Sequence, residues 1–175
     1  MITIDQVSTI ILAVNVTIDT EGLIDAVGHG WKPGYGTAPG IASTSGGSGA
    51  SHGGLGGQGN GSTISSPSYS NVQQPTKYGS GGSVGTGMSD GGEGGGVIYL
   101  KASHNMEIDG DIKVNGKTAE TITSGGGSGG SVLLEAPHFT GKRFMVFNAT
   151  FNNISVISWR SVLLVEKTGV PGENH

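Results

Sequence analysis

The amino-acid sequence predicts an all-β fold in which short parallel strands stack on one another, rung upon rung, as in a solenoid. Three observations lead to this prediction: glycine supplies 35 of the 175 residues, apolar and polar residues alternate in short runs between the glycines, and two pieces of sequence recur. Alternation with a period of two is typical of strands, because successive side chains point to opposite faces. Helices are disfavoured, since each glycine costs about 1 kcal/mol in a helix interior.

The composition excludes several classes of protein. Only 13% of the residues are charged and the net charge is −4, so the chain has no basic surface for nucleic acid or anionic lipid. Cysteine is absent, which excludes a disulfide framework and a Cys-type zinc site. The apolar run at 10–16 is much shorter than the roughly 20 residues that cross a bilayer. We therefore expect neither a nucleic-acid partner nor a transmembrane segment.

The chain divides into a repeat region and a different C-terminal part. Residues 1–141 form the predicted repeat region, with a Gly-rich insertion at about 29–94. We expect a loose loop there, and ordered packing of polyproline-II-like strands is the alternative. Residues 142–175 lack the repeat pattern and form an atypical strand or tail, either a cap or the result of truncation.

Two pairs of segments carry the internal repetition. VTIDTEGLIDAVG at 16–28 matches MEIDGDIKVNG at 106–116, and GGVIYLKA at 95–102 matches GGSVLLEA at 129–136. A sandwich of hairpins would give the same alternation but has no reason to repeat its motif, whereas successive coils of a solenoid share one core at equivalent positions. Matched residues should therefore stack about 4.8 Å apart. The side chains expected to face the core are Ile18, Ile24, Ile98, Leu100, Ile108, Ile112, Val132 and Leu134. Those expected to face outward are Val97, Tyr99, Lys101, Glu107, Asp111 and Lys113.

The string IDGDIKVNG at 108–116, followed by GGGSGGSVLLEA at 125–136, resembles glycine-rich repeats of large secreted and cell-surface proteins. The resemblance covers roughly residues 10–141. It implies a single-stranded parallel β-helix, right-handed, similar to the pectin-lyase-like fold and to adhesin passengers. It implies no catalytic residues. The apolar segment after Gly141 departs from the family pattern, which leaves the place of residues 142–175 open.

Motifs that suggest nucleotide binding or nucleophilic catalysis are interpreted as chance. Residues 110–118 approach a phosphate-binding loop, but five residues instead of four separate Gly110 from Gly116, and no helix signal follows. The pattern G-x-S-x-G occurs at Ser83 and Ser128 without the strand-turn-helix context of a nucleophile elbow.

Other polar and aromatic groups are interpreted as structural. Calcium binding or lyase chemistry would need a carboxylate cluster with a nearby base, and the candidates are Asp19, Asp109, Asp25, Asp111 and Lys113. Asp before Gly is a common turn pairing, which favours a turn at Asp109. His104 and His138 recur at the repeat spacing and are interpreted as a stacked corner pair. A sugar-stacking surface would use Trp31, Tyr35, Tyr69, Tyr78 and Tyr99, and an ice- or surface-binding face would use Thr118, Thr121 and Thr123. No catalytic, cofactor-binding or metal-binding residue is predicted.

The expected function is that of a structural or adhesive repeat module in an extracellular or cell-surface protein, without enzymatic activity or cofactor. Four N-x-[ST] sequons fit a secreted, glycosylated protein, at Asn15, Asn60, Asn148 and Asn153. Carbohydrate or other surface proteins are the partners that this expectation allows. A carbohydrate-binding or polysaccharide-lyase-like β-helix is the alternative.

Overall fold

A computed structural model describes residues 8–43, 45–59, 65–71, 75–84, 91–121 and 123–141, together with the backbone of 157–159 and 162–166. The described residues contain strands and no helix. The strands are β1 (Ser8–Ile18), β2 (Leu23–Asp25), β3 (Val97–Ile108), β4 (Asp111–Lys113), β5 (Ser131–Glu135), β6 (His138–Thr140), β7 (Ile157–Trp159) and β8 (Val162–Glu166).

Parallel pairing joins the recurring segments that the repetition matches. β1 pairs with β3 in parallel, and Ile18 lies opposite Ile108. β3 pairs in parallel with β5, where Leu100 lies opposite Leu134. β2 pairs with β4, which places Ile24 opposite Ile112. The predicted stacking of matched positions is therefore confirmed.

The core consists of the inward side chains of these stacked strands. Seven of the eight predicted core residues are buried, and Ile24 is half-buried and packs against them. Met106 and Val114 join the same core, both almost completely inaccessible to solvent. One outward assignment was wrong: Val97 is only 5% exposed.

The prediction of a single-stranded parallel β-helix was wrong, and its handedness falls with it. The strands form two small sheets, one of six strands in the order β1-β3-β5-β8-β7 with β6 beside β3, and one made of β2 and β4. The larger sheet is mixed, because β8 pairs antiparallel with β5 and β7 pairs antiparallel with β8. No sheet closes on itself or winds through the described residues as a solenoid. The glycine content explains why no solenoid forms. Each sheet of a solenoid must contribute side chains to the core, and the segments that connect the stacked strands are too rich in glycine to contribute them.

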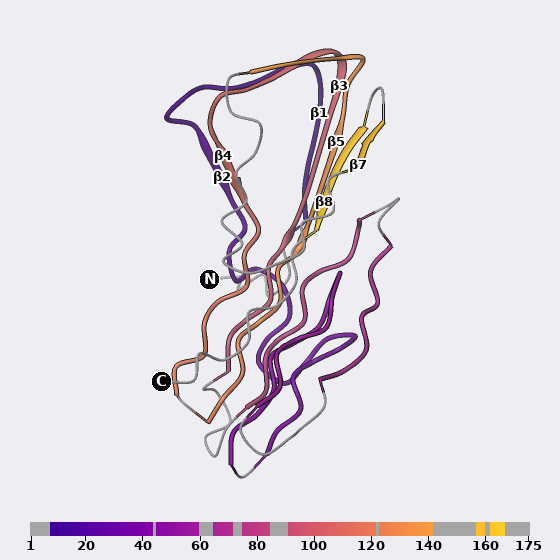
Figure 1. The fold of residues 1–175 in the computed structure, drawn as a ribbon. Helices are drawn as coiled ribbons and strands as arrows, with labels where there is room; N and C mark the ends of the chain where they lie inside the picture. The colour runs from indigo at the N-terminus through magenta and orange to yellow at the C-terminus, as the bar shows by residue number, and fades with distance from the viewer. Residues whose placement is uncertain are drawn as a thin grey trace.

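The glycine-rich segments form an ordered second half of the molecule, so the expected projecting loop is wrong for the described residues. They run as extended segments below the sheets in Figure 1, bundled side by side. Backbone hydrogen bonds join segments that are far apart in sequence. The amide of Gly30 donates to the carbonyl of Gly94 at 2.7 Å, and the amide of Gly95 donates to the carbonyl of Ser128 at 2.9 Å. The alternative of ordered, side-by-side packing therefore describes this region better.

The absence of side chains is what allows these backbones to approach so closely. A Cβ atom on Gly82 would lie 1.8 Å from the carbonyl oxygen of Gly125, and one on Gly130 would lie 1.8 Å from the carbonyl oxygen of Gly96. Real Cβ atoms do not tolerate such contacts, and the obstructing atoms are backbone, which cannot rotate away. The bundle is therefore specified by glycine at these positions and not by a hydrophobic pattern.

We predict that Gly82→Ala lowers the free energy of unfolding by about 3 kcal/mol, because the added methyl overpacks a backbone contact. Denaturant unfolding followed by circular dichroism measures the change. Gly53→Ala is the matched control, since Gly53 is exposed, and it should stay within about 1 kcal/mol of the parent. Equal stabilities for the two variants would contradict close backbone packing at Gly82.

Candidate functional site

An open hollow lies at the end of the stack formed by β1 and β2. Its volume is about 960 Å³. Apolar side chains from the inward positions of the two strands line it, among them Ile11, Val16 and Ile24. The acidic residues Asp19 and Glu21 belong to the same lining. The hollow therefore combines an apolar floor with carboxylates.

The strand that borders this hollow is unusually exposed and apolar. Ile10 is 62% exposed, Leu12 is 68% exposed and Val14 is 62% exposed. β1 contains no charged residue over its whole length. Within the described part of the chain it pairs with β3 alone. In the sequence this segment was interpreted as an apolar run too short to cross a bilayer, and its lack of charge was the signal that could have marked it as a candidate interaction surface.

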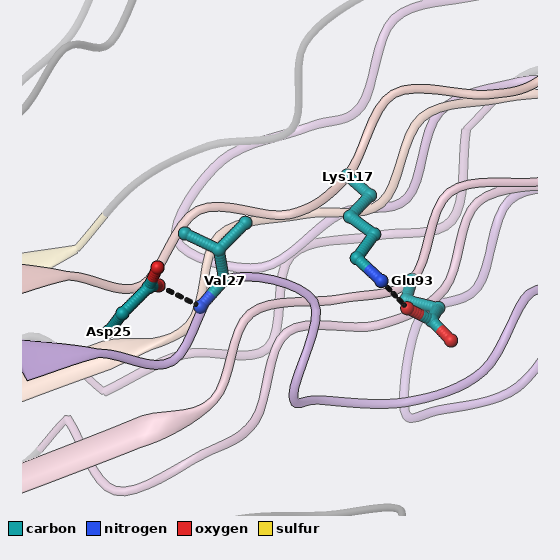
Figure 2. Close-up of polar contacts among 4 residues, drawn as sticks. All are labelled: Asp25, Val27, Glu93 and Lys117. Atoms are coloured by element: carbon teal, nitrogen blue, oxygen red, sulfur yellow. Dashed lines mark hydrogen bonds and ion pairs between the residues drawn. The ribbon is translucent and has the colours of Figure 1, made fainter.

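The carboxylates weighed for calcium binding do not assemble into a metal site in the described residues. Asp25 accepts a hydrogen bond from the backbone amide of Val27 at 2.8 Å, which is a local turn contact (Figure 2). Asp111 lies 3.7 Å from the ammonium group of Lys113. Asp109 lines the hollow together with Asp19, and the chain bends after it at Gly110. In the part of the chain described here, no group of three or more His, Cys, Asp or Glu side chains is arranged to hold a metal ion.

The two G-x-S-x-G serines are buried structural groups. The hydroxyl oxygen of Ser128 accepts a hydrogen bond from the amide of Ser80 at 2.7 Å. Ser83 is fully buried, and its hydroxyl has no hydrogen-bond partner among the described residues. The strand–turn–helix context of a nucleophile elbow is missing, as is the helix that should follow a phosphate-binding loop at 110–118, because the described residues contain no helix.

The repeated histidines do not face each other. β6 pairs with β3 so that His138 lies opposite Asn105, one position beyond His104. Both His104 and His138 are exposed. The threonines remain a local cluster, in which the hydroxyls of Thr121 and Thr123 are 3.3 Å apart.

Two of the aromatic side chains weighed for sugar stacking make contacts within the fold. Tyr69 packs against a buried histidine, and Tyr78 hydrogen-bonds through its hydroxyl to the hydroxyl of Ser8 at 2.6 Å. Of the five aromatics, only Tyr35 is strongly exposed, at 66%. Tyr69 and Tyr78 thus fasten segments of the fold together and do not form a sugar-stacking platform.

A polar network crosses the outer face of the larger sheet. The ammonium group of Lys101 lies 2.9 Å from a carboxylate oxygen of Glu135, and the hydroxyl of Tyr99 donates to the same oxygen at 2.9 Å. The hydrogen bond from Lys101 lowers the pKa of Glu135, and that carboxylate raises the pKa of Lys101. The network joins β3 to β5, although such exposed pairs contribute little to stability. Lys117 and Glu93 form a second ion pair at 2.6 Å (Figure 2).

One buried histidine, which the sequence analysis did not single out, lies in the glycine bundle. His52 is fully buried, and its Nδ1 donates to the carbonyl oxygen of Gly129 at 2.7 Å. Its ring centroid lies 4.9 Å from that of Tyr69, and its Nε2 has no hydrogen-bond partner among the described residues. Burial lowers the pKa of His52 to about 4, although the hydrogen bond to Gly129 opposes this. The imidazole is therefore neutral at pH 7 and pins segment 48–52 to segment 125–130.

Comparison with protein-family models, with curated proteins and with solved structures finds no match to this chain. The described residues also contain no helix long and apolar enough to pass through a bilayer.

We predict that His52 makes stability fall as the medium is acidified. Its folded pKa of about 4 lies below the ordinary value of 6.5, so the unfolded chain binds a proton first as the pH falls. The loss should begin near pH 6.5, grow until about pH 4 and reach roughly 3 kcal/mol.

The measurement is urea unfolding of the parent and of His52→Asn across this range, since Asn keeps a donor near the position of Nδ1. The parent should be the more stable protein near neutrality, and the difference should shrink with acidification. Two curves that stay parallel from pH 7 to pH 4 would show that His52 is not buried in its neutral form.

Proposed function

We propose that this chain is a structural or adhesive repeat module of an extracellular or cell-surface protein and that it has no catalytic activity. The observation that carries the proposal is that three buried serine hydroxyls accept hydrogen bonds from the chain's own backbone. Ser80 accepts a hydrogen bond from the amide of Ala38 at 3.0 Å, and Ser48 accepts one from the amide of Ile41 at 2.9 Å. Together with Ser128, these hydroxyls bind the chain's own backbone. Polar groups committed to the scaffold are available neither for catalysis nor for ligand binding.

The physical character of the scaffold supports a mechanical or spacing role. Two coils leave the glycine bundle: 91–117 runs through the 12-residue strand β3 and then β4, and 123–141 runs through the 5-residue strand β5 and then β6 beside β3. Parallel strand pairing joins successive coils in the sheets, and backbone hydrogen bonds join them in the glycine bundle. A unit joined at both ends resists shear between its coils, and repetition of such units gives a stiff surface module.

A second candidate function is carbohydrate binding, and one observation favours it. The hollow brings Asp19, Glu21 and Asp109 beside an apolar floor. Carboxylates that accept hydrogen bonds from hydroxyl groups, next to apolar surface, are a common arrangement for sugar recognition. The lyase version of this idea would also need a bound calcium ion and a base, for which the described residues provide no cluster.

We predict that the chain neither binds nor cleaves acidic polysaccharides. Polygalacturonate and alginate, each with added Ca²⁺, should give no binding heat in calorimetry and no unsaturated product by ultraviolet absorbance. In single-molecule pulling between two handles, the module should unfold in one cooperative step.

Two results would contradict the proposal. One is polysaccharide cleavage or binding that disappears in Asp19→Asn together with Asp109→Asn, while His104→Asn, an exposed change elsewhere, leaves it intact. The other is pulling traces in which the coils extend independently at low force, because a stiff module requires coupled coils.

A further inference from the structure

We propose that a second copy of this chain pairs antiparallel with the free edge of β1, so that two modules join end to end through a shared sheet. β1 lies at the end of its sheet. β3 occupies one edge of β1, and no other strand among the described residues occupies the opposite edge. Unpaired backbone amides and carbonyls along such an edge are a ready template for another strand.

The side chains of β1 are the reverse of those that protect a free edge. Proteins usually keep open edges from associating by placing charges on them. Here the charged residues lie on the neighbouring strand β3: Leu12 of β1 is opposite Lys101 of β3, and Thr17 is opposite Glu107. The outermost strand thus carries apolar or neutral groups where the covered strand carries charged ones. This pattern is expected of a strand that another strand covers.

Symmetry decides the direction of the partner. Two identical copies that meet through the same edge are related by a two-fold axis. If the strands ran parallel, this axis would place the core face of one copy beside the solvent face of the other. An axis perpendicular to the sheet makes the strands antiparallel and keeps both apolar faces on one side. Only this arrangement extends the hollow's floor of Ile11, Val16 and Ile18 into the second copy.

The distribution of charge favours the same direction. Asp19 and Glu21 follow directly after β1, so parallel strands would place these carboxylates against themselves. At the opposite end of β1, Tyr78 is hydrogen-bonded to Ser8, and its neighbour Lys77 is exposed. An antiparallel copy brings its carboxylates toward Lys77, where the charges are complementary.

The far edge of the same sheet already shows this kind of pairing. There β8 adds antiparallel to β5 over five residue pairs, from Ser131 opposite Glu166 to Glu135 opposite Val162. The sheet therefore accepts an antiparallel apolar strand at one end, and β1 of a second copy supplies an equivalent strand at the other.

The inward positions of β1 fix the register. Ile11 lies opposite the buried Leu100, while Val16 lies opposite the buried Met106, because an irregularity between Ala13 and Asn15 shifts the alternation. Directly opposed residues of antiparallel strands share a face. When Ile11 of one copy lies opposite Val16 of the second copy, inward-facing side chains of the two strands lie opposite each other on both sides of the irregularity. Ile10 then faces Thr17 on the outer side.

Sedimentation equilibrium of the full chain tests the association. We expect a reversible dimer that forms in the micromolar to millimolar range. Leu12→Lys should weaken it at least about tenfold, because a charge is placed on the paired edge. Leu55→Lys is the matched control, since Leu55 is 65% exposed and Leu12 is 68% exposed, and it should leave the association unchanged. Thermal melting verifies that both variants remain folded.

Cysteine cross-linking tests the register, and the chain has no native cysteine to interfere. A mixture of Ile10→Cys and Thr17→Cys proteins should form the mixed disulfide under mild oxidation in preference to either homodisulfide, because directly opposed Cα atoms lie within disulfide range. Preferential self-cross-linking of Leu12→Cys would instead indicate parallel strands and overturn the proposal. A chain that stays monomeric at millimolar concentration would also overturn the proposal. This includes the case in which other residues of the same chain cover the edge of β1 and protect its amides from hydrogen exchange. Equal weakening by Leu12→Lys and Leu55→Lys would also overturn it.

Discussion

The in-register parallel pairing of β1, β3 and β5 is the constraint on which the rest of the structure depends. It places Ile18 on Ile108 and Leu100 on Leu134, so that one continuous apolar core replaces several small ones. No single strand of this chain could bury its apolar face alone, because the intervening segments are rich in glycine. Stacking is therefore the route by which a sequence with so few large apolar residues gains enough burial to fold.

The glycine bundle and the stacked strands depend on each other. The hydrogen bond from the Gly95 amide to the Ser128 carbonyl lies two residues before β3 begins at Val97 and three before β5 begins at Ser131. The backbone contacts of the bundle therefore set the register in which the two strands enter the sheet. In return, the sheet holds the glycine segments side by side at a separation that their backbones could not maintain alone, since glycine loses the most conformational entropy on folding. His52 and Tyr69 add one of the few side-chain anchors within the bundle.

Some of this architecture could be predicted from the sequence, and physical reasons separate the successes from the failures. The strand pairing and most of the core could be predicted because recurring aliphatic positions imply a shared interior. The β-helix was a wrong extension of that prediction, because polyglycine carries no periodic side chains and so gives no sign of how its backbones pack. The offset of His138 to Asn105 arises because β3 runs unbroken from Leu100 to Asn105, whereas the matching residues are split between β5 and β6.

The candidate surface was harder to predict than the core. The free edge of β1 depends on which strand lies outermost, and the repetition alone does not specify this order. Likewise, the burial of His52 follows from glycine segments closing over it, although its sequence neighbours are small and polar. Both features emerge only when the stacking order is known, which is why the sequence patterns predicted strand pairs and core positions but no site.

The most direct test of the account is the parallel register itself. Thr17 lies opposite Glu107, and Thr17 and Glu107 are both exposed on adjacent strands. The double variant Thr17→Cys with Glu107→Cys should form an intrachain disulfide on mild oxidation, seen by mass spectrometry of proteolytic fragments, and should unfold at a higher temperature once oxidised. Thr17→Cys with Lys101→Cys, which antiparallel pairing would bring together, should remain reduced. The opposite outcome, a disulfide to position 101 and none to position 107, would contradict the stacked arrangement.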